Sequence, residues 1–341
     1  MNTAFKRRSD RRDFILGASA LSAATLVGVP SRAAAEPPPE VTKIRLIQNG
    51  AICLAPQLFA EELLHLEGFS RVEYIAQADE DPDPYVLVAA GRADFTLDGA
   101  TALVPAIDSG RPFVVLAGVH GGCYELFASG RVRAIKDLKG KSIAIGGNGA
   151  ADHVYISSMM AYVGMDPRSD VKWIDTKSFD GPMELFVAGK ADAFLGFPPQ
   201  PQQVRAKKVG QVIVNTAQDA PWSQHFCCML VGDREFVRKY PVATKRVLRG
   251  ILKAADVCAR QPERVARYIV RKGYEANYDI ALEVVKEVSF SAWRTYNPDD
   301  TLRFHALRLH EVGMIKSSPQ KIIAQGTDWR FLNELKRELK A

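Results

Sequence analysis

The chain has 341 residues, of which 47% are apolar and 25% are charged, so its composition is that of a soluble globular protein with room for two domains. Its formal net charge of +6 lies mostly at the N-terminus, because residues 1–35 contain six basic and two acidic side chains. The remaining residues are close to neutral, which gives no support for a nucleic-acid-binding protein or for a surface that binds anionic membranes.

The first 35 residues have the features of an export signal. Arg11-Arg12-Asp13-Phe14-Ile15-Leu16 resembles the twin-arginine signature, an uncharged stretch follows as far as Val29, and Ala33-Ala34-Ala35 is an A-x-A cleavage pattern. A membrane anchor is the alternative, but the stretch from Phe14 to Val29 is shorter than the ~20 apolar residues that span a bilayer. We therefore expect a mature periplasmic protein that begins near Glu36, exported by the twin-arginine route and not embedded in the membrane.

Strands and helices alternate in the next part of the chain. This order is typical of an α/β protein with a doubly wound parallel sheet. The predicted strands are Lys43–Gln48, Val72–Ala76, Phe95–Leu97 and Phe113–Val119, and the predicted helices are Pro56–Leu66, 84–91 and Ala102–Ile107.

The same alternation starts again near Ile135 and ends near Phe226. After residue 234 the pattern is mainly helical. The second run predicts helices at Ile135–Leu138, His153–Val163, 182–189 and Val204–Lys208 and strands at Ser142–Ile145, Val171–Ile174, Ala193–Leu195 and Val212–Asn215; the tail predicts helices at Arg234–Lys239, Ala243–Ala259, Pro262–Lys272, Tyr278–Ala292, Asp300–Val312 and Asp328–Glu338.

Two lobes follow from this restart. We predict that residues 36–125 and 229–341 form the first lobe and residues 126–228 the second. Two strand-like crossings, Cys123–Ala128 and Phe226–Val231, would join the lobes as a hinge.

One eleven-residue pattern occurs in both predicted lobes. Pro84–Asp94 reads PYVLVAAGRAD, and the segment 98 positions later, Pro182–Asp192, reads PMELFVAGKAD. A Pro suits the first turn of a helix, and Gly91 and Gly189 stand where a helix ends in a left-handed residue. We interpret the repeat as one helix–Gly–strand unit used twice, with its Gly and Asp residues serving the scaffold.

Several motifs together resemble a known family, the periplasmic solute-binding components of ABC importers for nitrate, sulfonates, taurine and thiamine-precursor pyrimidines. They are Lys136-Asp137-Leu138-Lys139-Gly140-Lys141, the two A-G-[RK]-A-D units, Phe197-Pro198-Pro199, Tyr240-Pro241 with the helix after it, and Thr327-Asp328-Trp329-Arg330-Phe331-Leu332. The resemblance implies the two-lobed fold of periplasmic binding proteins of type II. It also implies a ligand cleft between the lobes and a membrane permease with its ATPase as partners.

The candidate ligand-binding residues come from the loops after the predicted strands, because ligands of open α/β sheets bind beyond the carboxyl ends of strands. Glycines and helix N-termini in these loops can present backbone N–H groups to a ligand. The loop 146–149 (GGNG) is either such a cradle or a turn that needs Gly and Asn, and Asn49 is likewise a turn residue or a ligand contact. The candidates are Asn49, Gly50, Ala51, Gly99, Ala100, Thr101, His120, Gly147, Asn148, Gly149, Ala150, Thr176, Phe197 and Trp222.

The sequence spacing gives no metal site and no cofactor motif. His120, His153 and His225 do not have the spacing of zinc ligands, and the Gly loop lacks the full dinucleotide pattern. The five cysteines are interpreted as small buried side chains, with a bridge from Cys123 to Cys227 or Cys228 as an alternative. The candidate loops show no surplus of Arg or Lys, which disfavours a multiply charged anion.

We therefore expect a monomeric solute receptor that closes on a small organic or oxyanion ligand without catalysing a reaction. A receptor that signals without transport would have the same sequence features. An enzyme related to pyrimidine-precursor synthases is a third hypothesis, but of the cysteine-rich motif of those enzymes only Cys227-Cys228 is present.

Overall fold

The computed structural model describes residues 1, 36–78, 83–130 and 132–340, and residues 38–341 form one compact unit. The predicted export signal, apart from Met1, lies outside the described residues. Over the part of the chain that is described, no helix has the length and apolar character needed to cross a membrane.

The first sheet has the strand order β2-β1-β3-β10-β4. Strands β3, β4 and β10 are almost wholly buried, whereas the edge strand β2 is partly exposed, and β1 pairs with β2 and β3 in parallel. The last strand in sequence, β10, lies antiparallel between β3 and β4. The strands are β1 (Lys43–Gln48), β2 (Arg71–Ala76), β3 (Phe95–Gly99), β4 (Phe113–Gly121) and β10 (Phe226–Asp233).

The second sheet repeats this arrangement, with the strand order β7-β6-β8-β5-β9. Here β5 lies antiparallel between β8 and β9. The strands of the predicted β-α runs are parallel where they pair with one another, as β1 with β2 and β3, whereas each crossing segment enters the next sheet as an antiparallel strand. The strands are β5 (Glu125–Ala128), β6 (Ser142–Ile145), β7 (Lys172–Asp175), β8 (Ala193–Gly196) and β9 (Gln211–Asn215).

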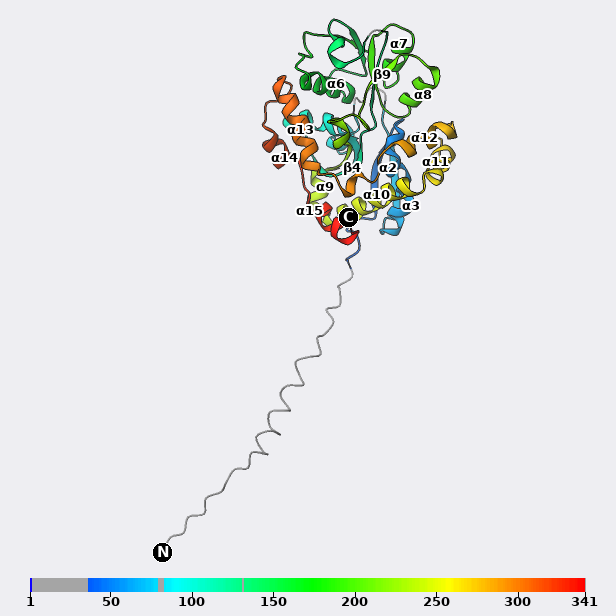
Figure 1. Ribbon diagram of the computed structural model, residues 1–341. Coiled ribbons are helices and arrows are strands. Elements are labelled where there is room, and N and C mark those ends of the chain that lie inside the picture. Colours follow the sequence, from blue (N-terminus) through cyan, green and yellow to red (C-terminus); the bar gives the residue numbers. More distant parts are fainter. Residues whose placement is uncertain (2–35, 79–82, 131, 341) are drawn as a thin grey trace. The chain divides into compact units, whose positions relative to one another are not determined.

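Helices cover both sheets, and in Figure 1 α6, α7 and α8 lie at the end that holds β9, whereas α9, α10 and α15 lie at the end that holds β4. Most predicted helices are present, but the helix predicted at Tyr278–Ala292 ends at Glu287, and α14 was not predicted. The helices are η1 (Ile52–Leu54), α2 (Ala55–Phe59), α3 (Glu61–Leu66), α4 (Tyr85–Ala89), α5 (Ala100–Asp108), η2 (Ile135–Leu138), α6 (Ala151–Tyr162), α7 (Gly181–Val187), α8 (Gln200–Lys207), η3 (Trp222–Gln224), α9 (Arg234–Lys239), α10 (Pro241–Arg260), α11 (Pro262–Arg271), α12 (Tyr278–Glu287), η4 (Ala292–Arg294), α13 (Pro298–Glu311), α14 (Pro319–Gly326) and α15 (Arg330–Glu338).

We call the sheet β2-β1-β3-β10-β4 with its helices the first lobe, and the sheet β7-β6-β8-β5-β9 with α6, α7 and α8 the second lobe. Helix α6 packs against α5 and α13, and α8 packs against α12, so the lobes contact each other on both sides of the crossings. The exact residues at which the chain passes between lobes stay a prediction.

The two copies of the repeat have matching structural roles. Asp94 accepts a hydrogen bond from the backbone N–H of Arg45 in β1 at 2.7 Å, and Asp192 accepts one from Ser142 N–H in β6 at 2.8 Å. Gly91 and Gly189 have φ of 68° and 71°, in the left-handed region that favours glycine. Each copy therefore ends a helix and fixes the first strand of its sheet.

The crossings depend on glycines at points of close approach. A Cβ on Gly122 would lie 1.9 Å from the backbone oxygen of Thr216, and a Cβ on Gly118 would lie 2.2 Å from the ring of Phe226. Real Cβ atoms do not approach other atoms so closely, so the segments before each crossing can pack here only because these positions lack side chains.

Candidate functional site

A cavity of about 240 Å³ lies between the loops of the two lobes. Its walls come from the residues that follow β1 and β2 on one side and β6, β7 and β8 on the other. It is lined by Asn49, Gly50, Gln77, Ala78, Asp83, Gly146, Ala150, Ala151, Asp152, Ser178, Phe179, Asp180 and Phe197. This position, at the carboxyl ends of parallel strands, is where the general rule for α/β sheets places a ligand.

The charged side chains of this lining are all acidic. Asp83 and Asp152 are buried, Asp180 is exposed, and no Lys or Arg is among the described lining residues. Burial raises the pKa of Asp152 to about 6. Burial, followed by the neighbouring Asp98 carboxyl, raises the pKa of Asp83 well above its usual range. The described lining therefore offers an anion no cation to pair with.

Three backbone donors of the Gly loop and the start of α6 already have acceptors within the chain. Gly146 N–H donates to Asp152 at 2.6 Å, Gly149 N–H donates to the ring of His153 at 2.9 Å, and Ala151 N–H donates to Asp83 at 3.1 Å. The last bond joins the lobes, because Asp83 belongs to the first lobe and Ala151 begins α6 in the second. An anion at the start of α6 would have to displace the Asp83 carboxyl.

Aromatic rings form the wall of the cavity on the side of the second lobe. Phe179 and Phe197 are half-buried and meet edge to face, with ring centroids 4.8 Å apart. Tyr124, from the first crossing, contacts Phe197 from the other side at 5.5 Å. Rings fixed in this way form an apolar wall, and a planar ligand can stack on the face of one of them.

Amide side chains complete the first-lobe wall. Asn49 accepts a hydrogen bond from Ala51 N–H at 3.0 Å, which is the turn that the sequence suggested, and its amide N–H donates to Gln77 at 2.9 Å. Asn49 thus serves the turn and also lines the cavity, so the two interpretations of this residue are compatible. Gln57, on α2, holds the strands beneath by donating to Ile47 O and accepting from Leu97 N–H.

A smaller cavity of about 70 Å³ adjoins the first one, because both are lined by Asn49, Gln77, Asp83, Ala151, Phe179 and Phe197. Its remaining lining reaches the crossings and includes the thiols of Cys53 and Cys228 and the side chain of Asp98. Burial raises the pKa of Asp98 to about 7, although its carboxyl accepts hydrogen bonds from Tyr85 N–H and Gly99 N–H. The hydrogen bond from Tyr85 N–H therefore fixes the first residue of α4 to Asp98. Helix α5 begins directly after Gly99.

The structure brings six of the predicted site residues to these cavities. They are Asn49, Gly50, Ala51, Gly99, Ala150 and Phe197. The other eight, Ala100, Thr101, His120, Gly147, Asn148, Gly149, Thr176 and Trp222, are not among the lining residues. Of these, Trp222 packs against Tyr162 and Thr176 hydrogen-bonds within its own lobe.

Sequence reasoning missed several lining residues. Ser178 and Asp180 lie in the loop after β7. The rule that ligands bind beyond the carboxyl ends of strands includes this loop, but only Thr176 was selected from it. Gln77 follows β2 directly, so the same rule applied to that strand would have found it. Asp83 carried no such signal, because its position depends on the packing of α6 across the cleft.

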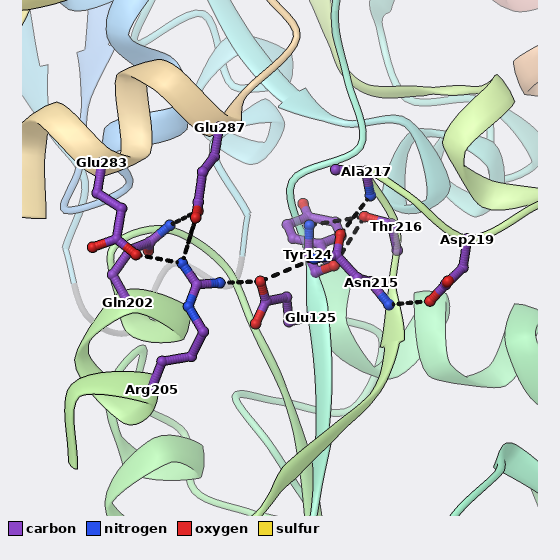
Figure 2. Close-up of polar contacts among 10 residues, drawn as sticks. All are labelled: Tyr124, Glu125, Gln202, Arg205, Asn215, Thr216, Ala217, Asp219, Glu283 and Glu287. Carbon is purple, nitrogen blue, oxygen red and sulfur yellow. Dashed lines mark hydrogen bonds and ion pairs between the residues drawn. The ribbon is translucent and has the colours of Figure 1, made fainter. Parts of the chain in front are cut away.

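A network of ion pairs joins the lobes beside the cavity. Figure 2 shows Arg205, on α8 of the second lobe, between Glu125 of β5 and the two acids of α12, Glu283 and Glu287. Arg205 Nη2 lies 2.7 Å from Glu283 and 2.8 Å from Glu287, and Gln202 donates to Glu287 at 2.8 Å. Burial raises the pKa of Glu125 to about 7 against the effect of the Arg205 guanidinium.

Two mixed sheets with a cavity between their strand ends define a two-lobed α/β binding-protein fold. The profile of the family described as NMT1/THI5 like matches residues 68–265, and the chain belongs to this family. No curated protein matches the chain in sequence.

Solved structures show the same fold. The periplasmic nitrate-binding protein NrtA from Synechocystis PCC 6803 is 17% identical with a TM-score of 0.72, over 89% of this chain and 90% of that chain. The alkanesulfonate-binding protein SsuA from Xanthomonas axonopodis pv. citri, bound to MOPS, is 15% identical with a TM-score of 0.69, over 87% and 100%. The aliphatic sulphonate binding protein SsuA from Escherichia coli is 15% identical with a TM-score of 0.63, over 85% and 94%. The predicted two-lobed fold is thereby confirmed.

Proposed function

We propose that this protein is the substrate-binding component of an ABC importer and that it captures a small solute in the periplasm for delivery to a membrane permease. The observation that carries the proposal is the cavity between the strand ends of the two lobes. The binding proteins with the same fold and the family membership support it. The export signal expected in residues 1–35 agrees with a periplasmic location by the twin-arginine route.

The chemistry of the lining indicates the class of solute. Nitrate and sulfonates need hydrogen-bond donors or cations, but here the titratable groups are Asp83, Asp152 and Asp180, and the N–H groups of Gly146, Gly149 and Ala151 are already bonded. The lining instead presents carboxyl and amide oxygens beside Phe179 and Phe197. We infer that the solute is a small nitrogen-containing organic molecule that donates hydrogen bonds and has a planar part.

Binding of such a solute needs no covalent chemistry. Carboxyl oxygens of Asp83 and Asp152 would accept its N–H groups, while the face of one of the two rings covers its flat part. Because the lining comes from both lobes, a bound solute would contact both and would favour the conformation in which they meet. The role proposed is therefore binding and delivery without catalysis.

The test is the melting temperature of the purified protein with a panel of compounds at equal concentration. Amino-substituted pyrimidines and other cyclic amines represent the proposed class, and nitrate, taurine and alkanesulfonates represent the class of the structural neighbours. We expect stabilisation by at least one amine of the panel and none by the anions. Stabilisation by nitrate or an alkanesulfonate alone would contradict the proposed class.

A matched pair of variants locates the site. Phe197→Ala removes a ring from the cavity wall and should reduce the ligand-induced shift. Trp222→Phe changes an aromatic residue that packs on Tyr162 away from the lining and should leave the shift unchanged. Equal loss of the shift in both variants would show that the solute does not bind in this cavity.

A further inference from the structure

Four of the five cysteines and one histidine gather at the floor of the cleft. We call Cys53, His120, Cys123, Cys227 and Cys228 the thiol–imidazole cluster. Two triplets, one of Cys53, His120 and Cys228 and the other of His120, Cys123 and Cys227, have ligand atoms that all lie within 4.8 Å of one another. All five side chains are buried.

The cluster is assembled from segments that are far apart in the sequence. Cys53 lies in η1 after β1, His120 lies near the end of β4, Cys123 lies in the first crossing, and Cys227 and Cys228 lie in β10. The sulfur atoms of Cys123 and Cys227 are 2.9 Å apart without a disulfide, and those of Cys227 and Cys228 are 3.8 Å apart. No spacing pattern in the sequence could reveal a site built in this way.

The state of His120 provides an independent indication of a ligand. Its Nδ1 lies 2.8 Å from the carbonyl oxygen of Gly121, and because a carbonyl only accepts, Nδ1 carries the proton. The lone pair of Nε2 then accepts no hydrogen bond of ordinary geometry from the described residues and has only the nearby Cys53 thiol as a contact, although the side chain is completely buried. A ring that donates to a backbone carbonyl through one nitrogen and offers the other is the usual arrangement of a metal-binding histidine.

The dimensions suit one metal ion. Four ligands at the usual Zn–S distance of about 2.3 Å around a tetrahedral ion lie ~3.8 Å from one another. The Cys227–Cys228 sulfur separation of 3.8 Å equals this value and each triplet lies within 4.8 Å, whereas Cys123 and Cys227, at 2.9 Å, would have to move apart to share one ion. Thiolate sulfur and imidazole nitrogen are the ligands that soft and borderline ions prefer over Mg²⁺ or Ca²⁺.

An access route is also present. Cys53 and Cys228 line the smaller cavity, which adjoins the larger one, so an ion can reach the cluster from the cleft. Binding would release the thiol protons to solvent, and the resulting thiolates would balance the charge of the ion in this buried place.

We propose that the thiol–imidazole cluster binds one thiophilic d¹⁰ cation, Zn²⁺ or Cu⁺, through three or four of its five side chains. The ion would lie under the solute cavity and would tie the first crossing, through Cys123, to the second crossing, through Cys227 and Cys228. This site is independent of the solute class proposed above, because its ligands are not the acids of the larger cavity.

The first test uses the full protein reduced under anaerobic conditions. Zn²⁺ and Cu⁺ are titrated separately in competition with chromophoric chelators, and the melting temperature is followed in parallel. We expect one equivalent of at least one of the two ions to bind and to raise the melting temperature. Failure of the reduced protein to bind a full equivalent of either ion would overturn the proposal.

Variants identify the ligands. Cys228→Ser and His120→Asn should each weaken the binding at least about 10-fold, since each removes a donor. Cys258→Ser is the matched control, because Cys258 is also completely buried but lies in α10 outside the cluster. Equal weakening by the control and the cluster variants would refute the assignment.

Two measurements on the unmodified protein remain decisive if a variant fails to fold. With ¹¹³Cd²⁺ in place of the native ion, the cadmium resonance should have the shift of a site dominated by sulfur ligands, and a shift typical of oxygen ligands would contradict the proposal. Protein isolated from exporting cells should contain the ion in mass spectrometry under native conditions. Isolation with a Cys123–Cys227 disulfide and no ion would also overturn it.

Discussion

The Arg205 network should make the stability of the protein depend on pH in a specific way. Glu125 is buried, with a side chain 6% exposed, and its pKa is raised to about 7. An unfolded chain has a Glu pKa of about 4.3, so the folded protein binds the proton more tightly and loses stability as the pH rises from about 4 to 7. Arg205 limits this loss, because its guanidinium stabilises the Glu125 carboxylate.

The substitution Arg205→Met keeps the apolar stem and removes the charge. Without Arg205 the pKa of Glu125 rises further. Above pH 7 the free energies of unfolding of wild type and variant therefore diverge by about 1.4 kcal/mol per pH unit, until Glu125 also ionises in the variant. At pH 8.5 this amounts to about 2 kcal/mol. At pH 5.5 Glu125 is protonated in both proteins. The remaining pairs with Glu283 and Glu287, whose side chains are 46% and 44% exposed, then contribute only ~0–1 kcal/mol.

The assay is urea unfolding of wild type and Arg205→Met at pH 5.5 and 8.5, with the free energy of unfolding compared at each pH. Glu125→Gln is the control background. In this background Arg205→Met should lower the free energy of unfolding by the same amount at both pH values. An equal cost at both pH values in the original background would refute this account. So would a pH dependence that persists after Glu125→Gln.

Three further predictions concern the scaffold and the cavity. Asp94→Ala removes the acceptor for Arg45 N–H and should lower the free energy of unfolding by about 2 kcal/mol without changing solute affinity, whereas an equal loss of affinity would show that Asp94 serves the site. Gly122→Ala places a methyl group against Thr216 O and should reduce the yield of soluble folded protein strongly, so a wild-type melting temperature would contradict the close approach of Gly122 to Thr216. Because the pKa of Asp152 is about 6, calorimetric affinity for a cationic amine should increase between pH 5 and 7, and a decrease would mean that this carboxyl is not a ligand group.

Much of the fold could be predicted because the local signals agree with the packing. The strands Lys43–Gln48 and Ser142–Ile145 were predicted with the bounds that the structure has, since their apolar pattern is clear and turn residues flank them. The two copies of the repeat were also interpreted correctly as scaffold units, with left-handed Gly91 and Gly189 at the helix ends.

Other features could not be predicted, for physical reasons. A fully buried strand such as β10 has apolar residues on both faces, and this pattern contains no information on its direction in the sheet. Helix α14 has only eight residues, of which Ile322 and Gly326 are buried, so its periodic signal is weak.

The site was only partly predictable because it is formed between two lobes. The strand rule identified the loops with Asn49 and Phe197, but the position of Asp83 depends on a contact across the cleft. The thiol–imidazole cluster likewise depends on the meeting of the two crossings, which no sequence spacing records.

The most direct test of the proposed function is the identity of the solute that the protein carries from its own compartment. The protein should be purified from exporting cells without denaturation, examined by native mass spectrometry, and then unfolded to release the ligand for identification. We predict a nitrogen-containing organic molecule with hydrogen-bond donors, bound one per chain and lost in the Phe197→Ala variant. A nitrate ion or a sulfonate in its place would contradict the solute class that we infer from the acidic lining.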